Sequence, residues 1–234
     1  MSEPTAPPTV VTPAPGDTAS HRPSVRTAPT RLTDKFVDAD VAQLEKLVRD
    51  AIVGHFGFVV DGQPRVMPIA IVADGASILL HGSTGSSWLR ALAGGIPVAL
   101  SITAVDGLVI ARSAFESSMH YRSAVLFGSC SVVEKSEKSE ILDRVTDALI
   151  PGRGAEVRPH APKELAATLM LRMSIDEWTL KVSDGWPEDE ESDVAGDTWA
   201  GVLPSATRYT EALPAPDLRE GIPVPPSVQG LLGR

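Results

Sequence analysis

The sequence predicts a mainly β fold, an antiparallel β-barrel with peripheral helices, and three observations support this prediction. Short runs rich in β-branched residues alternate with tight turns between residues 56 and 182. Asp-Gly pairs, which are strong hairpin signals, stand at 61–62, 74–75 and 106–107. These turns leave no room for the helical crossovers of a doubly wound α/β sheet. Antiparallel strands, here about seven, close into a barrel or pack as a sandwich.

The predicted elements begin with an amphipathic helix from Asp40, because apolar residues recur at helical spacing from Val41 to Ile52. Asp38 or Asp40 is available as its N-cap. Strands are predicted at 56–60, 66–72, 78–81, 98–105, 108–113, 121–134 and 169–182, and further helices at 86–92, 136–149 and 163–168.

Composition divides the chain of 234 residues into three parts. Residues 1–30 are rich in Pro, Thr, Ala and Ser and are predicted to be a disordered tail, because they offer too little apolar surface to offset the entropy of ordering. Residues 31–185 form the predicted barrel domain. Residues 186–234 are Pro-rich but keep Trp186 and Trp199, which predicts an extended arm that packs on the barrel or on a partner subunit.

Charge and cysteine content limit the partners and the location. The net charge of −9 argues against nucleic acid, whose binding needs a basic face. No apolar run has membrane-spanning length, and no signal peptide is expected, so a cytoplasmic location is predicted. The single cysteine, Cys130, lies in a predicted strand and is expected to be a buried structural thiol. The acidic run 188–193 is interpreted as a solvated loop.

The segment from His81 to Arg90 carries the strongest signal for a binding site. A strand ends, a turn rich in glycine and hydroxyl groups follows, and a helix begins. Unpaired N–H groups at a helix start attract anions, and Arg90 follows Ser86 and Ser87 by one helical turn. These features predict a phosphate site, although the P-loop pattern and its lysine are absent. The simpler alternative is a capped helix after a polar turn.

A second polar segment connects two predicted strands. Arg112 and Ser113 end one strand, and His120 to Ser123 begin the next. Rim loops of barrels build ligand sites, so these groups are candidates for a ligand or substrate face. An ordinary polar loop with salt bridges explains them equally well.

Metal and hydrolase sites are not indicated. The five histidines show no spacing typical of metal ligands, and the Gly-x-Ser-x-Gly elbow is absent.

Five segments in this order resemble the pyridoxamine 5′-phosphate oxidase-like, FMN-binding split barrels, and most closely the branch of nitroimidazole-reductase-like proteins. The resemblance covers residues 40 to about 204. The segments are Gly-His-Phe-Gly-Phe-Val at 54–59, Asp-Gly-Gln-Pro at 61–64, Leu-His-Gly-Ser at 80–83, Asp-Gly-Leu-Val-Ile-Ala-Arg-Ser at 106–113 and His-Tyr-Arg-Ser-Ala-Val-Leu-Phe-Gly at 120–128.

The resemblance implies an antiparallel split barrel that forms a homodimer, with FMN in a groove between the subunits. It implies that Arg90 holds the phosphate, and that Trp88 stands where the family has smaller or more polar residues. The cofactor-binding residues that it implies are His81, Gly82, Ser83, Ser86, Ser87 and Arg90, with Arg112, Ser113, Tyr121, Arg122 and Ser123 near the cofactor or substrate.

The function implied is an oxidoreductase that passes electrons from a reduced nicotinamide through FMN to a small-molecule acceptor. Related barrels use a deazaflavin or haem instead, and His81 or His120 would then be the axial ligand. A binding protein without catalysis is the remaining alternative, because a fold does not determine an activity.

Overall fold

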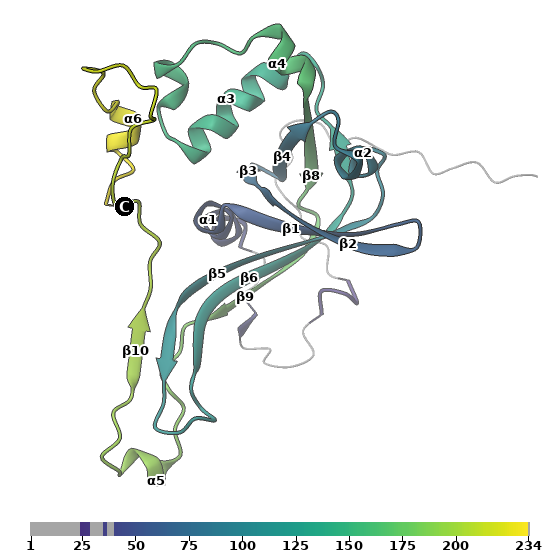
Figure 1. Ribbon diagram of the computed structural model, residues 1–234. Helices are drawn as coiled ribbons and strands as arrows, with labels where there is room; N and C mark the ends of the chain where they lie inside the picture. Colours follow the sequence, from purple (N-terminus) through teal and green to yellow (C-terminus); the bar gives the residue numbers. More distant parts are fainter. Residues whose placement is uncertain (1–23, 29–34, 37–39, 234) are drawn as a thin grey trace, which may run out of the picture.

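The structure is a computed structural model that describes residues 24–28, 35–36 and 40–233. In these residues ten strands form two antiparallel sheets around one core, an open barrel with helices at its periphery (Figure 1). This confirms the mainly β prediction. The strands are β1 (Val53–Val60), β2 (Gln63–Ala70), β3 (Val72–Asp74), β4 (Ser77–Ser83), β5 (Val98–Ile110), β6 (Ser118–Gly128), β7 (Cys130–Val132), β8 (Thr168–Ser174), β9 (Glu177–Ser183) and β10 (Gly201–Pro204).

The larger sheet has the order β2-β1-β5-β6-β9, with β10 paired to β5, and the smaller has the order β3-β4-β8-β7. Three predicted long strands are each divided between the two sheets. The chain passes from β2 to β3 at Ile71, from β6 to β7 at Ser129, and from β8 to β9 at Ile175 and Asp176. These crossings form the corners of the split barrel.

Two of the three predicted Asp-Gly turns are confirmed. Asp61 and Gly62 have φ of 52° and 72° and join β1 to β2, and Gly75 has φ of 56° between β3 and β4. The third prediction is wrong, because Asp106 and Gly107 lie inside β5 at a bulge. A glycine is needed at position 107 because β10 passes close by. A Cβ at this position would lie 2.6 Å from the carbonyl oxygen of Leu203. The turn of this hairpin is formed by residues 111–117 instead.

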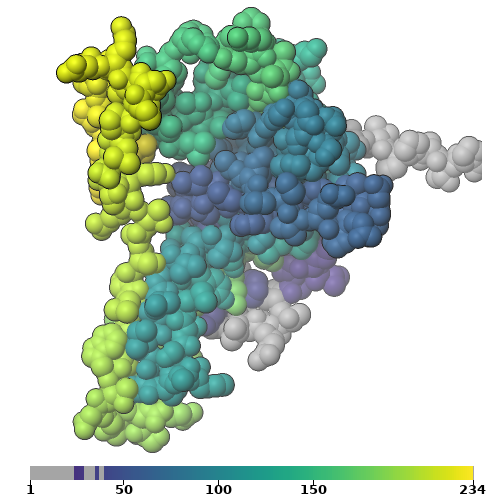
Figure 2. Space-filling model, viewed as in Figure 1, coloured from purple at the N-terminus to yellow at the C-terminus, as the bar shows by residue number. Residues whose placement is uncertain are grey.

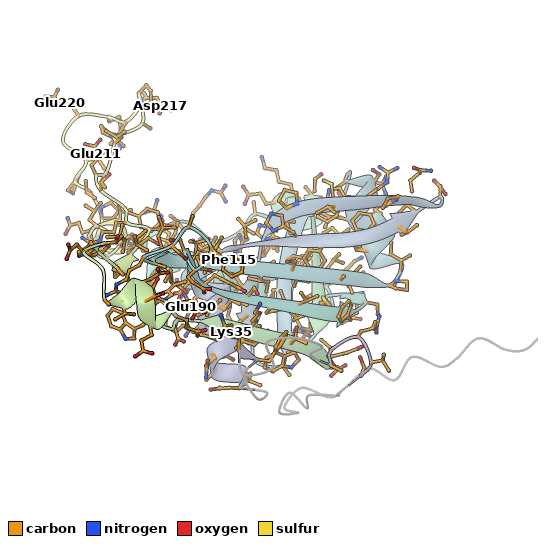
Figure 3. All side chains as sticks on the ribbon, turned by 90° about the horizontal axis from the view of Figure 1, so that it is seen from below. Lys35, Phe115, Glu190, Glu211, Asp217 and Glu220 are labelled. Carbon is orange, nitrogen blue, oxygen red and sulfur yellow. The ribbon has the colours of Figure 1, made fainter. Side chains whose placement is uncertain are left out.

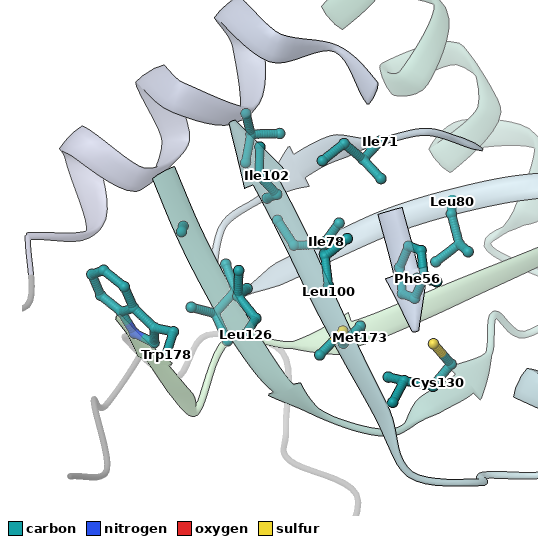
Figure 4. Close-up of a cluster of buried hydrophobic side chains, with 14 of the residues drawn as sticks. Phe56, Ile71, Ile78, Leu80, Leu100, Ile102, Leu126, Cys130, Met173 and Trp178 are labelled. Carbon is teal, nitrogen blue, oxygen red and sulfur yellow. The ribbon is translucent and has the colours of Figure 1, made fainter. Parts of the chain in front are cut away.

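The main core lies between the sheets (Figure 4). Helix α1 (Val41–Ala51) packs Leu44, Leu47 and Val48 against it, and Asp40 caps the helix by accepting hydrogen bonds from Ala42 and Gln43. Cys130 is 4% exposed, and burial raises the pKa of its thiol to about 12, as expected of a structural cysteine.

A second apolar cluster lies under α3 (Lys138–Leu149), on the outer face of the smaller sheet. It joins Ile141, Leu142 and Val145 of the helix to Leu79 of β4 and Met170 of β8. Short helices α2 (Ser87–Ala93) and α4 (Pro162–Ala167) complete the barrel region.

Both ends of the chain contact the barrel. Of the predicted disordered tail, 1–23 and 29–30 lie outside the described residues. Within 24–28, Ser24 and Arg26 donate hydrogen bonds to Glu177, and Arg26 lies 4.5 Å over the ring of Phe127. The arm after residue 185 contains α5 (Glu191–Val194), β10 and α6 (Pro226–Gln229), and α6 contacts the 3-10 helix η2 (Arg153–Glu156). No helix in the described residues is long and apolar enough to cross a membrane.

Candidate functional site

The turn between β4 and α2 has the strand–turn–helix geometry that the sequence predicts. The backbone N–H of Gly85 donates to Ser83 Oγ at 3.1 Å, and that of Ser86 donates to the Ser83 carbonyl at 3.0 Å. Ser86 is the N-cap of α2 and accepts from the Leu89 N–H at the long distance of 3.5 Å. The Thr84 N–H donates to the Ala167 carbonyl at 2.9 Å, which ties the turn to the start of β8.

Arg90 folds back over this turn. Its guanidinium donates to the Thr84 carbonyl at 2.8 Å and is otherwise exposed. Within the part of the chain that the structure describes, the exposed hydroxyls of Thr84 and Ser87 have no protein hydrogen-bond partner. A cationic guanidinium and two free hydroxyls at one rim form a set of donors suited to an anionic group such as a phosphate.

Trp88 explains why this segment departs from the polar pattern of the family. Its indole stacks on Phe58 of β1, with the ring centroids 6.3 Å apart. Leu89 is buried, and a Cβ on Gly82 would lie 2.6 Å from its Cδ1 atom. The helix is therefore fixed to the barrel by apolar contacts, and Gly82 allows its close approach.

His81 does not join this turn. Side chains alternate along a strand, so His81 lies on the face of β4 opposite to the one where Gly82 meets α2. It is directly opposite the buried Met170 of β8. Burial lowers the pKa of His81, which favours its neutral imidazole.

Arg112 is held by the arm. Its backbone N–H donates to Asp189 at 2.6 Å and its guanidinium donates to the same carboxylate at 2.9 Å. The Asp189 side chain is 1% exposed, so the interpretation of 188–193 as a solvated loop is wrong at this residue. Ser113 accepts a hydrogen bond from the Glu116 N–H and shapes the same hairpin turn.

Arg122 is also committed to structural ion pairs. Its guanidinium donates to Asp106 of β5 at 2.7 and 2.8 Å and to Asp50 of α1 at 2.8 Å. These hydrogen bonds raise the pKa of Arg122 above its usual range, although partial burial opposes them. We therefore interpret it as a residue that joins α1 to the β5–β6 hairpin.

Tyr121 and Ser123 lie on the other face of β6. Lys181 lies 5.3 Å from the Tyr121 ring, and Ser123 is opposite Lys181 in the β6–β9 register. His120 forms a hydrogen bond of 2.8 Å with the Gly185 carbonyl through Nε2, at the start of the arm.

The second predicted group is spread along β5. Arg112 and Ser113 follow its far end, whereas Tyr121, Arg122 and Ser123 pair with Val105, Ala104 and Thr103 near its middle. Helix α2 precedes the start of β5 at Val98, and Arg112 follows its end at Ile110. The strand has 13 residues. At about 3.3 Å per residue it extends roughly 40 Å. Figure 1 shows the two ends well apart, so one chain does not bring Arg112 and Ser113 to the same ligand as the α2 turn.

The sequence does not indicate two ion-pair contacts that hold predicted site residues: Asp189 with Arg112, and the Asp50–Arg122–Asp106 cluster. Asp189 stands 77 residues from Arg112, and Asp50 stands 72 from Arg122. No local pattern signals pairs at these separations. The surplus of acids in 188–193 was the one available sign that some of them are paired.

The fold and these sites define an antiparallel split barrel with an added C-terminal arm. The family model described as pyridoxamine 5′-phosphate oxidase matches residues 40–182. The chain therefore belongs to the pyridoxamine 5′-phosphate oxidase family. No similar sequence was found among the curated proteins.

Three solved structures are similar to this chain. The FAD and haem binding protein from Mycobacterium smegmatis is 48% identical over 85% of this chain and 98% of its own, with a TM-score of 0.81. The flavocytochrome Anf3 from Azotobacter vinelandii is 32% identical over 91% of this chain and 100% of its own, with a TM-score of 0.82. A putative 5-nitroimidazole antibiotic resistance protein from Bacteroides thetaiotaomicron, 17% identical over 63% of this chain and 86% of its own, with a TM-score of 0.53, shares the fold.

Proposed function

We propose that this protein binds a flavin and a haem and acts as an oxidoreductase that passes electrons from a reduced nicotinamide to a small-molecule acceptor. One observation carries the proposal: two relatives above 30% identity, a FAD and haem binding protein and a flavocytochrome, both match along most of this chain. The sequence alone favours FMN, but the Mycobacterium smegmatis relative, a FAD and haem binding protein, favours FAD. A bound flavin supplies hydride and electron transfer, and a bound haem supplies single-electron transfer.

The turn 83–87 and Arg90 are proposed to hold the flavin phosphates. The support is the set of exposed donors at this rim, the Arg90 guanidinium and the hydroxyls of Thr84 and Ser87. The backbone hydrogen bonds of the turn fix these donors before a ligand arrives, which reduces the entropy lost on binding.

His81 is the better of the two proposed haem ligands. An iron ligand must be a neutral imidazole, and the burial of His81 lowers its pKa, which favours that form. Among the described residues His81 has no hydrogen-bond partner, whereas His120 uses Nε2 to bond the Gly185 carbonyl.

Titration of the full-length protein with FAD, FMN and haemin tests both assignments. Arg90→Ala should weaken flavin binding about tenfold or more, because a charge-assisted hydrogen bond is lost. Arg65→Ala, at another exposed arginine, should have no effect. His81→Ala should remove the Soret band, and His120→Ala should retain it. Unchanged flavin affinity in Arg90→Ala, or a Soret band in His81→Ala, would contradict the assignments.

A homodimer is proposed through the outer face of the larger sheet. On β2, β1, β5 and β6 the core-facing side chains alternate with an outward row that has no Lys, Arg, Asp or Glu. Val59, Val66 and Val105 in that row are more than half exposed. Charge depletion with exposed apolar groups is typical of an interface core. The row includes Val53, His55, Gly57, Val59, Val66, Ala99, Ser101, Thr103, Val105, Met119, Tyr121, Ser123 and Val125.

Such a dimer would offer a second copy of the Arg112–Ser113 turn to the α2 rim, which one chain cannot do. Light scattering of the wild type and of Val59→Asp/Val105→Asp tests it, with dissociation expected in the variant. A cytoplasmic location remains a prediction from the sequence.

A further inference from the structure

The arm contains a segment, residues 205–224, that is fixed at both ends. Between these ends Tyr209 pairs with Leu232 and accepts a hydrogen bond from the Gly233 N–H at 3.1 Å, but none of the segment's large apolar side chains is buried. We call this segment the strap. At one end β10 pairs with β5, and the Ser205 N–H donates to the Asp106 carbonyl at 2.9 Å. At the other end Ser227 of α6 donates backbone and hydroxyl hydrogen bonds to Glu156 of η2.

The exposed apolar side chains of the arm do not pack into the core of their own barrel. The described chain has twenty exposed large hydrophobic residues, and ten of them follow residue 185. The buried hydrophobic core of the described chain ends at Leu180 and includes none of them. In the strap, five such residues are exposed, with Leu213 at 79%: Tyr209, Leu213, Leu218, Ile222 and Val224.

Figures 2 and 3 show this separation. In Figure 2 the arm runs as a ridge along one side of the molecule. In Figure 3 Glu211, Asp217 and Glu220 of the strap stand away from the sheets, whereas Phe115 and Glu190 lie at the hairpin. Ordering a residue costs about 1–2 kcal/mol in backbone entropy, so a strap with few internal contacts needs another surface to offset that cost.

We propose that the strap lies on a second copy of this chain, and that each copy of the dimer receives the strap of the other. The strap carries Arg208 and Arg219 against Glu211, Asp217 and Glu220, a net charge of −1. It therefore approaches a chain of net charge −9 with little repulsion.

The size of the strap suits this exchange. Its twenty residues match the 20–30 residues per side of a standard interface. If each strap lies on the other copy about a two-fold axis, the strap covers the same surface of both copies. A closed two-fold dimer requires such equivalent contacts. The outer sheet face also exposes apolar residues, Val59, Val66 and Val105, so one association would bury residues of both this face and the strap.

The relatives extend past the barrel as well. The Azotobacter flavocytochrome covers 91% of 234 residues, about 213, so its match reaches at least 31 residues beyond residue 182, where the family model ends. Part of the arm is therefore shared with the flavocytochrome. The proposal deepens the homodimer proposed above and is independent of which cofactor the barrel holds.

Photo-crosslinking tests it directly in the full-length protein. Cys130 is 4% exposed and burial raises its pKa to about 12, so a cysteine added by Leu213→Cys is labelled selectively with a benzophenone maleimide. In a mixture of ¹⁴N and ¹⁵N protein, irradiation should give a covalent dimer whose crosslinked peptides join the two isotopes. Val157→Cys, 44% exposed and outside the arm, is the control and should give none. Crosslinks within one copy only, or no crosslink, would overturn the proposal.

A second experiment uses dimer dissociation measured by light scattering. Leu213→Asp/Leu218→Asp should raise the dissociation constant about tenfold or more, since both residues are exposed in the single chain and the barrel keeps its core. Val132→Asp/Val157→Asp, at similar exposure outside the arm, should leave the constant unchanged. Equal constants for the two variants would overturn the proposal. Flavin retention is read separately, so loss of the strap contact and loss of cofactor binding are distinguished.

Discussion

The barrel and the arm are held in place by different forces. The barrel buries a continuous apolar core in which Phe56, Leu100 and Leu126 are completely inaccessible to solvent. The arm buries none of its large apolar side chains and is attached by the β10–β5 ladder, the Arg112–Asp189 pair and the Glu156–Ser227 contact. Apolar burial therefore determines whether the barrel folds, while a few polar contacts and one backbone pairing determine where the arm lies.

The largest expected effect is in the barrel core. Phe56→Ala should lower the free energy of unfolding by about 3–5 kcal/mol, because it leaves a cavity at a residue of 0% exposure. Phe115→Ala, at 91% exposure on the hairpin, should change it by less than about 0.5 kcal/mol. Urea denaturation measures the free energy of unfolding of both variants, which are prepared with the same cofactor occupancy. Similar losses in both would contradict the division between core and periphery.

The next effect concerns the ion pair that fixes the arm. Asp189→Ala leaves the Arg112 guanidinium and backbone N–H without their acceptor, which should cost about 2–4 kcal/mol locally. Hydrogen exchange of the β10 amides should accelerate, while that of β1 and β6 stays slow. Glu190→Ala, at an exposed neighbour, is the control. Unchanged β10 protection in Asp189→Ala would show that the ladder alone holds the arm.

A smaller effect is expected at the close approach of β10 to β5. A Cβ on Gly107 would lie 2.6 Å from the Leu203 carbonyl oxygen, so Gly107→Ala should displace β10 at a cost of about 1–3 kcal/mol. Gly57→Ala is a matched strand control, since its Cβ would meet only the Ala99 carbonyl oxygen at 3.6 Å. Exchange rates of β10 amides distinguish them. Equal rates in the two variants would mean that β10 tolerates the methyl group.

The smallest effect is the pH dependence of the cluster that joins α1 to the hairpin. Burial raises the pKa of Asp50, but the hydrogen bonds from Lys46 and Arg122 lower it by more. The net shift of the Asp50 pKa is therefore downward. A lowered pKa in the folded state stabilises the protein above the ordinary Asp value of about 4, and this contribution is lost as the pH falls through the folded pKa. Because the Asp50 side chain is 37% exposed, the contribution should be below about 1 kcal/mol.

Asp50→Asn should therefore lower stability at pH 6, in urea denaturation at each pH. Its stability should converge with that of the wild type once the pH falls below the folded pKa of Asp50. Asp197→Asn, at an exposed residue without an ion pair among the described residues, should follow the wild type throughout. A constant difference between Asp50→Asn and the wild type would contradict the charge argument.

Local signals predicted the elements well and the long-range contacts poorly. Asp61-Gly62 and Asp74-Gly75 predicted hairpins correctly because a two-residue turn is decided by its own residues. Asp106-Gly107 is the same dipeptide, but it lies in a bulge of β5 and does not form a turn. Strand β10, which packs against this bulge, lies 94 residues or more further along the chain.

The corners of the barrel were missed for a related reason. Apolar alternation continues through Ile71 and through Ile175, both 1% exposed, so the pattern of side chains gives no sign that the strand changes sheets. At the candidate site, the turn and cap around Ser86 were predictable from local chemistry, whereas the partners of Arg112 and Arg122 lie too far along the chain to be predicted.

The most direct test of the proposed function is the absorption spectrum of the full-length protein, recorded as purified and again after FAD, FMN and haemin are added and the excess is removed. The account predicts retained flavin bands together with a Soret band, and FAD as the flavin released on denaturation. A protein that retains neither cofactor after these additions would contradict the account.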